Sequence, residues 1–89
     1  MTLQNLKYVV AVAEHGSFSA AAKALYISQS TLSSAIKELE AELGTQLFLR
    51  SNRGIQPTPA GEDFLRYARA LVEKSRALER RYRPRRYEP

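Results

Sequence analysis

The first part of the chain carries apolar residues at the spacing of a helix. Leu3, Leu6 and Val9 follow one another at intervals of three, which predicts a first helix. Gly16 comes next, and we expect it to end this helix because glycine adopts the left-handed cap conformation at little cost. Ser17 is then placed to cap a second helix, since its hydroxyl can accept a hydrogen bond from a free backbone N–H.

Two further helices are predicted before residue 45. The second helix is expected to bury a face made of Phe18, Ala21, Ala22 and Leu25. Ser28 can cap the third helix and Gly44 can end it. The apolar face of this third helix has intervals of four, three and four residues and consists of Leu32, Ile36, Leu39 and Leu43. A tight turn joins the second and third helices.

The pattern changes to that of short strands after Gly44. We expect a strand over residues 46–50, a turn over residues 51–54 rich in Asn and Gly, and a second strand over residues 55–58. Pro57 fits only a sheet edge or a strand end, because it lacks a backbone N–H. Such a hairpin beside a helix-turn-helix is called a wing.

The last helix is predicted from Pro59 to about Arg83. Thr58 can cap it, proline suits its first position, and Pro84 would stop it. Its apolar positions alternate at intervals of four and three, the pattern of a coiled-coil seam. They are Phe64, Ala68, Leu71, Ser75, Leu78 and Tyr82, and Leu65 and Val72 widen the stripe.

Two interpretations of this stripe remain open. Phe64 and Ala68 can equally well pack on the core of their own domain. For Leu71, Leu78 and Tyr82 we favour a second copy of the chain, because a helix that projects from so small a domain cannot hide them. The stripe therefore predicts a homodimer.

Composition excludes several classes of protein. Eighty-nine residues make one small domain, and the absence of cysteine together with a single histidine, His15, argues against a disulfide framework and a metal site. One histidine and scattered acids cannot assemble a catalytic set, so no enzyme is expected. No segment approaches the roughly 20 apolar residues of a membrane span, and no signal peptide precedes the first helix. We expect a cytoplasmic chain without membrane contact.

The net charge of +5 comes mainly from the C-terminal part. Residues 1–58 carry five basic and four acidic side chains, whereas residues 59–89 carry nine and five. Five arginines gather at the end, namely Arg80, Arg81, Arg83, Arg85 and Arg86. We interpret them as a solvated linker segment, because the last helix would lead them away from the third.

The strongest functional signal is the polar face at the start of the third helix. It consists of Gln29, Ser30, Thr31, Ser33, Ser34 and Lys37. Small hydrogen-bonding side chains at a helix N-terminus suit entry into the DNA major groove. The amide of Gln29 can pair with adenine, although a solvated glutamine is the alternative, and the methyl of Thr31 can contact thymine. Ser33 and Ser34 can bond bases or phosphates, although Ser34, with its short side chain, can equally well make no direct contact, and Lys37 is expected at a phosphate.

Four residues outside this helix complete the predicted interface. Arg50 ends the first strand, where it can pair with a phosphate or with a carboxylate such as Glu40. Arg53, at the wing tip, is placed to enter a minor groove. Ser17 and Ser19 can bond phosphates, although helix capping explains at least one of them.

The run from about Leu3 to Leu71 resembles the N-terminal domain of LysR-type bacterial transcriptional regulators. The resemblance lies in residues 18–25 (FSAAAKAL), 27–33 (ISQSTLS), 36–44 (IKELEAELG), 47–50 (LFLR) and 58–61 (TPAG). It implies a mainly α winged helix-turn-helix fold, with a three-helix core and a hairpin wing over residues 1–58. Residues 59–89 would form the dimerisation and linker helix and a basic tail.

The resemblance also implies partners and a function. The module would bind double-stranded DNA sequence-specifically, as a dimer on an interrupted inverted repeat, and the full-length protein could form a tetramer. A small-molecule inducer would bind a larger effector domain outside this chain, which itself needs no cofactor. Ser30 and Ser34 stand where many members have proline and arginine, so a long donor for guanine is missing. We infer that base readout leans more on DNA shape and on four residues of the third helix, Gln29, Thr31, Ser33 and Lys37. The alternative is a helical protein-interaction module, or one that binds nucleic acid non-specifically through the basic tail.

Overall fold

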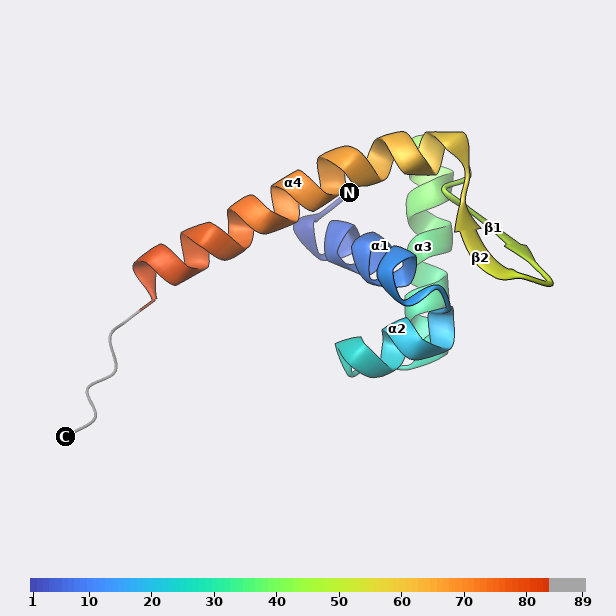
Figure 1. Cartoon of the computed structure of the whole chain (residues 1–89), viewed down its shortest axis with the longest axis horizontal. Helices are drawn as coiled ribbons and strands as arrows, with labels where there is room; N and C mark the ends of the chain where they lie inside the picture. Colours follow the sequence, from blue (N-terminus) through green and yellow to red (C-terminus); the bar gives the residue numbers. More distant parts are fainter. Residues whose placement is uncertain (84–89) are drawn as a thin grey trace.

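Three helices, a two-stranded hairpin and a long final helix make up the described part of the chain (Figure 1). The structure is a computed structural model that describes residues 1–83. The elements in chain order are α1 (Leu3–His15), α2 (Phe18–Leu25), α3 (Gln29–Leu43), β1 (Phe48–Ser51), β2 (Gly54–Pro57) and α4 (Pro59–Tyr82). The predicted architecture is confirmed. The predictions on Pro84, Arg85 and Arg86 lie outside the described residues.

Capping residues set the helix boundaries. The hydroxyls of Ser17, Ser28 and Thr58 each accept a hydrogen bond from the backbone N–H three residues further on, at 3.0, 3.0 and 2.9 Å. Gly16 and Gly44 end α1 and α3 in the left-handed conformation, with φ of 69° and 68°. These five residues are the ones that the sequence predicted.

The hairpin is shorter at its entry than the sequence predicted. β1 begins at Phe48 rather than at Gln46, because the N–H of Leu47 is hydrogen-bonded to the α3 side chain Glu40 instead of a strand partner. The strands pair antiparallel from Phe48 opposite Pro57 to Ser51 opposite Gly54, which leaves a turn of two residues. Pro57, which lacks a backbone N–H, is the last residue of β2, and the hydrogen bond at this end runs from the N–H of Thr58 to the carbonyl of Leu47 at 2.9 Å.

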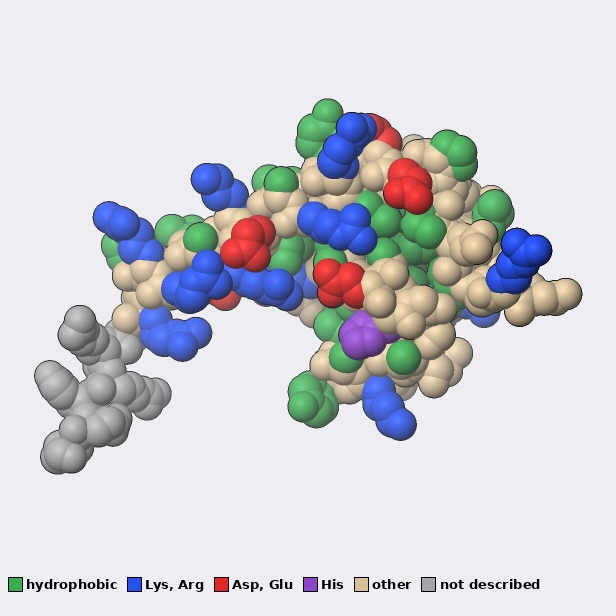
Figure 2. Space-filling model, in the orientation of Figure 1, with side chains coloured by type: hydrophobic (Ala, Val, Ile, Leu, Met, Phe, Trp, Pro, Cys, Tyr) green, Lys and Arg blue, Asp and Glu red, His purple; other side chains and the backbone are tan. Residues whose placement is uncertain are grey.

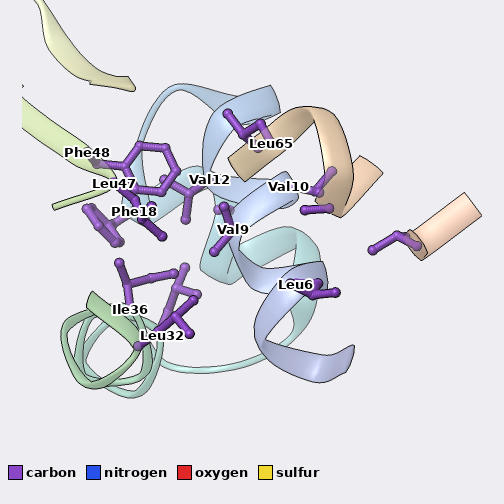
Figure 3. Packing of buried hydrophobic residues seen from close by; sticks show 14 of the residues in the cluster. Leu6, Val9, Val10, Val12, Phe18, Leu32, Ile36, Leu47, Phe48 and Leu65 are labelled. Atoms are coloured by element: carbon purple, nitrogen blue, oxygen red, sulfur yellow. The ribbon is translucent and has the colours of Figure 1, made fainter. Parts of the chain in front are cut away.

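The core lies where α1, α2, α3 and the first half of α4 meet (Figure 3). It contains only apolar side chains among the described residues, and Figure 3 shows Val9, Val12, Phe18, Leu32 and Ile36 converging on it from three helices. Leu25 and Leu43, which we expected to be buried, are only half-buried at the edge of this cluster. Both lie in the last turn of their helices, where fewer neighbours cover them.

The first half of α4 packs on α1 and on the entry to the hairpin. Leu65, Ala68 and Val72 are buried in the core and so are unavailable to a second chain. This corrects the assignment of Leu65 and Val72 to a dimer seam, and for Ala68 it decides between the two open interpretations in favour of the core. The reason is geometric, because at about 100° per residue these side chains point roughly 60–120° away from Leu71. Beyond Val72 no described side chain of α4 is buried, and Figure 1 shows this half projecting from the other helices.

No helix in residues 1–83 is long and apolar enough to cross a membrane.

Candidate nucleic-acid interface

The polar face of α3 is presented to solvent because the opposite face anchors the helix in the core. Leu32, Ile36 and Leu39 are buried under α1 and α2. On the exposed side lie Gln29, Ser30, Thr31, Ser34 and Lys37. Ser33, which sits between the two faces, is half-buried. The structure therefore brings the six predicted residues together on one helix, five of them open to a partner.

A cluster of hydroxyls fixes the first turn of α3. The hydroxyl of Ser28 donates to that of Thr31 at 2.8 Å while accepting from the Thr31 backbone N–H at 3.0 Å. The hydroxyl of Ser30 lies 3.2 Å from that of Ser28. Because a β-branched side chain has few rotamers, this bond holds Thr31 in one of them. Sequence reasoning identified Ser28 as a cap but missed that it orients Thr31.

A groove of about 350 Å³ separates α3 from β1. Its lining includes Ser33 and Lys37 from α3, Arg50 from β1 and Phe18 from α2. Glu40 also lines the groove, so two cationic side chains and one carboxylate face it from two different elements. The two cations suit an anion such as a backbone phosphate.

Arg50 has partners that the sequence did not suggest. Its guanidinium carbon lies 4.4 Å from the centre of the Phe18 ring, and its Nη2 donates to the hydroxyl of Ser33 at 3.5 Å, the long limit of a hydrogen bond. The predicted alternative, an ion pair with Glu40, is not formed among residues 1–83. No signal in the sequence places the start of α2 beneath the end of β1.

The carboxylate of Glu40 is hydrogen-bonded to the backbone instead. Its Oε2 accepts hydrogen bonds from the N–H groups of Leu47 at 2.7 Å and Phe48 at 3.2 Å. Bonds from two N–H groups to a carboxylate are charge-assisted and fix the strand entry against α3. The carboxylate therefore sets the position of the wing relative to the exposed helix.

The remaining predicted residues lie at two places. Arg53 is exposed in the two-residue turn at the wing tip, and the hairpin that carries it projects from the helices (Figure 1). Ser17 is half-buried and acts as the α2 cap, whereas Ser19 is exposed on α2. Capping thus accounts for Ser17, and Ser19 has a hydroxyl without a partner among the described residues.

The charged residues of α4 form a separate region. Figure 2 shows Lys and Arg side chains spread along the projecting half of this helix. Two of its arginines pair within the helix, Arg66 with Asp63 and Arg80 with Glu73. All four side chains are more than half exposed, so these pairs contribute little to stability.

An apolar groove of about 370 Å³ lies beside α4 at its packed end. Leu6, Leu43, Phe64, Tyr67 and Leu71 are among its lining residues. Further along the same side of the helix, Leu78 and Tyr82 are exposed and Ser75 is half-buried. The remaining seam residues thus form a strip along α4 that is apolar except for one serine, with the groove at one end and exposed side chains at the other. The strip consists of Phe64, Leu71, Ser75, Leu78 and Tyr82.

The capped helix pair, the exposed polar helix and the flanking hairpin define a winged helix-turn-helix protein. Residues 3–62 match the family described as "Bacterial regulatory helix-turn-helix protein, lysR family". The chain belongs to this family.

Several relatives are transcriptional regulators. The chain is 48% identical over 73 residues to the HTH-type transcriptional regulator TcbR of Pseudomonas sp. (strain P51), covering 82% of this chain and 25% of TcbR. It is 48% identical over 87 residues to the HTH-type transcriptional regulator BudR of Klebsiella aerogenes, covering 90% of this chain and 61% of BudR. The chain therefore spans between a quarter and about three fifths of the length of these two relatives.

Solved structures show the same fold. A crystal structure of a CbnR DBD–DNA complex matches with a TM-score of 0.83 and 44% identity, covering 93% of this chain and 95% of that one. A BenM DBD complex with benA site 1 DNA matches with a TM-score of 0.83 and 44% identity, covering 88% of each chain.

Proposed function

We propose that this chain binds double-stranded DNA in a sequence-specific manner, as the DNA-reading part of a LysR-type transcriptional regulator. The observation that carries the proposal is the α3 face, whose five exposed polar side chains are held by a buried opposite face. Family membership and the two related DNA complexes support it.

Each element has its own part in this mechanism. Helix α3 enters the major groove, where Gln29 pairs with adenine and Thr31 presents its methyl group to thymine. Ser30 and Ser34 bond bases or phosphates within their short reach. Lys37 and Arg50 bind phosphates from the two sides of the groove between α3 and β1, and Ser17 and Ser19 extend these contacts along the backbone. Arg53 reaches the minor groove at the wing tip.

Two copies of the chain act together. The strip formed by Phe64, Leu71, Ser75, Leu78 and Tyr82 has an open groove at one end and bare side chains at the other. When a second copy lies antiparallel to the first, the exposed end of its strip, Leu78 and Tyr82, occupies this groove. Two-fold symmetry makes the same contact at the other end. The α3 helices then enter successive major grooves on one face of the duplex, about 34 Å apart or a small multiple of that, so the operator is an interrupted inverted repeat.

The rest of the regulator lies beyond this chain. In our proposal residues 1–58 bind DNA, residues 59–89 form the linker and dimerisation segment, and a further domain binds a small-molecule inducer. The regulator works in the cytoplasm, has no catalytic activity, and can form a tetramer as a full-length protein. We propose that the chain itself needs no cofactor.

The test begins with selection of a binding duplex from a random pool. Fluorescence anisotropy then compares the selected duplex with a scrambled one at several salt concentrations. Sequence-specific binding predicts a preference that persists as salt rises, because only phosphate contacts are lost steeply with salt. Equal binding of both duplexes at every salt concentration would contradict the proposal.

A matched pair of glutamine variants locates the reading helix. Gln29→Ala should weaken binding to the selected duplex by about tenfold to a hundredfold, the cost of one lost bidentate base contact, and leave the scrambled duplex unaffected. Gln4→Ala changes an exposed glutamine on α1 and should alter neither. Equal losses in the two variants would place the readout elsewhere.

The alternative, non-specific binding through the basic tail, makes the opposite prediction. A chain in which the five C-terminal arginines are all changed to Gln should keep its preference for the selected duplex if α3 reads DNA. It should lose most of its affinity if the tail is the binding element.

A further inference from the structure

The contact between Arg50 and Phe18 joins the wing to the buried core. Phe18 is the first residue of α2 and only 6% exposed, whereas Arg50 is exposed on β1. The guanidinium covers the ring at 4.4 Å from its centre, which is within the range of a cation–π interaction. One side chain of the core therefore supports a cation at the edge of the groove between α3 and β1.

This contact leaves the guanidinium available to an anion. An arginine has five N–H donors, and among residues 1–83 only one hydrogen bond from Arg50 is formed, the long one to Ser33. The nearby carboxylate of Glu40 is taken by the backbone of Leu47 and Phe48. The ring attracts the cation through its π face and consumes none of its donors.

Holding an arginine in place before binding changes its affinity for phosphate. A free arginine loses rotamer entropy when it binds. A side chain that is already stacked has lost part of this freedom on folding, so less is lost on binding. Arg53 at the wing tip has no such support, since among the described residues no aromatic ring lies under it.

We propose that Phe18 is a positioning residue for DNA binding, which holds Arg50 over the groove so that its guanidinium meets a backbone phosphate. The proposal rests on the proposed function, because it needs the chain to bind DNA. It assigns a role in affinity to a core side chain that acts through Arg50.

A double-mutant cycle tests the proposal on a scrambled duplex, so that it depends on phosphate contacts and not on sequence readout. Phe18→Leu keeps an apolar side chain in the core but removes the ring face. It should weaken binding by about twofold to fivefold with Arg50 present, and have no effect when combined with Arg50→Ala. Arg53→Ala serves as the control, and with it the effect of Phe18→Leu should be unchanged.

The outcomes separate the two claims. Equal losses from Phe18→Leu with and without Arg50 would show a structural role only and overturn the proposal. An Arg50→Ala variant with unchanged affinity would also overturn it, while leaving the proposed function intact. If the unaltered chain bound no duplex at all, the proposed function would fail as well.

A second pair of variants decides the matter if Phe18→Leu does not fold, as judged by circular dichroism. Arg50→Lys and Arg53→Lys both keep the positive charge but replace the planar guanidinium, which stacks well, by an ammonium. The loss of affinity should be at least twofold greater at Arg50 than at Arg53. Equal losses at the two positions would overturn the proposal.

Discussion

Helices α3 and α4 both carry an apolar stripe, but only the stripe of α3 is covered by the chain itself. Leu32, Ile36 and Leu39 are at most 3% exposed. On α4, Leu71, Leu78 and Tyr82 are 53%, 60% and 71% exposed. The helix is 24 residues long, or about 36 Å, and the three-helix core is too small to cover it.

The two stripes serve different processes, because the stripe of α3 contributes to folding and the stripe of α4 is available for association. A stripe whose central residues are buried stabilises the monomer, and its opposite face is free to serve as a binding surface. A stripe that stays exposed in the monomer gains stability only from a partner. The two sides of α4 can be tested separately, because the buried and the exposed side chains alternate along one helix.

The largest expected effect is on the covered side of α4. Leu65→Ala removes a side chain that is 1% exposed and should lower the free energy of unfolding by about 2–5 kcal/mol. Leu71→Ala, six residues on, should change it by less than about 0.5 kcal/mol at concentrations where the chain is monomeric. Urea denaturation followed by circular dichroism measures both. Similar losses in the two variants would erase the distinction between the two sides.

Gly61 tests how closely α4 approaches the hairpin. A Cβ atom at this position would lie 2.0 Å from the carbonyl oxygen of Leu47, so Gly61→Ala must push backbone away from backbone. We expect a destabilisation of about 3 kcal/mol. Gly44→Ala, which meets nothing within 4 Å but has a φ of +68°, should cost only about 1–2 kcal/mol. A smaller loss at Gly61 than at Gly44 would refute the close approach.

A charge on the exposed side of α4 should separate the two copies. Leu78→Asp buries a carboxylate in the proposed seam, so the dimer dissociation constant should rise at least about tenfold, or 1.4 kcal/mol. Ala77→Asp adds the same charge about a third of a turn away and is the control. Sedimentation equilibrium measures both constants. If the two variants dimerise alike, the seam lies elsewhere.

Loss of the capping hydroxyl should destabilise the chain more at the start of α4 than at the start of α2. The hydroxyl of Thr58 caps α4 and also donates to the carbonyl of Gln46 at 2.6 Å, whereas Ser17 accepts one bond only. Ser17→Ala should cost about 1 kcal/mol of unfolding free energy and Thr58→Ala somewhat more. Thermal and urea unfolding of both variants give the order, and the reverse order would contradict it.

The smallest effect is expected at the far end of α3. The amino group of Met1 lies 2.7 Å from Oε2 of Glu42, and both groups are about half exposed. Glu42→Gln should therefore lower the unfolding free energy by less than about 1 kcal/mol, and less still at high salt. A loss that does not diminish with salt would mean that Glu42 does more than pair with this amine.

Local chemistry made most of the fold predictable. Ser17, Ser28 and Thr58 cap helices because of their own hydroxyls, and Gly16 and Gly44 end helices because of their own conformational freedom, so the element boundaries follow from short stretches of sequence. The polar face of α3 is likewise set by helical spacing alone. The LysR family was recognisable for the same reason, from short runs of residues.

Contacts between distant elements were not predictable. The spacing on α4 could not tell which side the core would take, so Leu65 and Val72 were assigned to the seam although they are buried, and Ala68 was left open between seam and core. The partner of Arg50 depends on how α2 meets β1, and the role of Glu40 on how α3 meets the strand entry. Tertiary packing decides all of these.

A single residue joins the wing to the long helix. β2 ends at Pro57 and α4 begins at Pro59, so Thr58 is the whole connection, and the proline rings on both sides restrict its neighbours' backbone rotation. Its N–H and hydroxyl are bonded to the carbonyls of Leu47 and Gln46. The hairpin and the helix are therefore joined by a short connection with little freedom to rotate. The joint that sets the direction of α4 thus also sets the direction in which the hairpin projects.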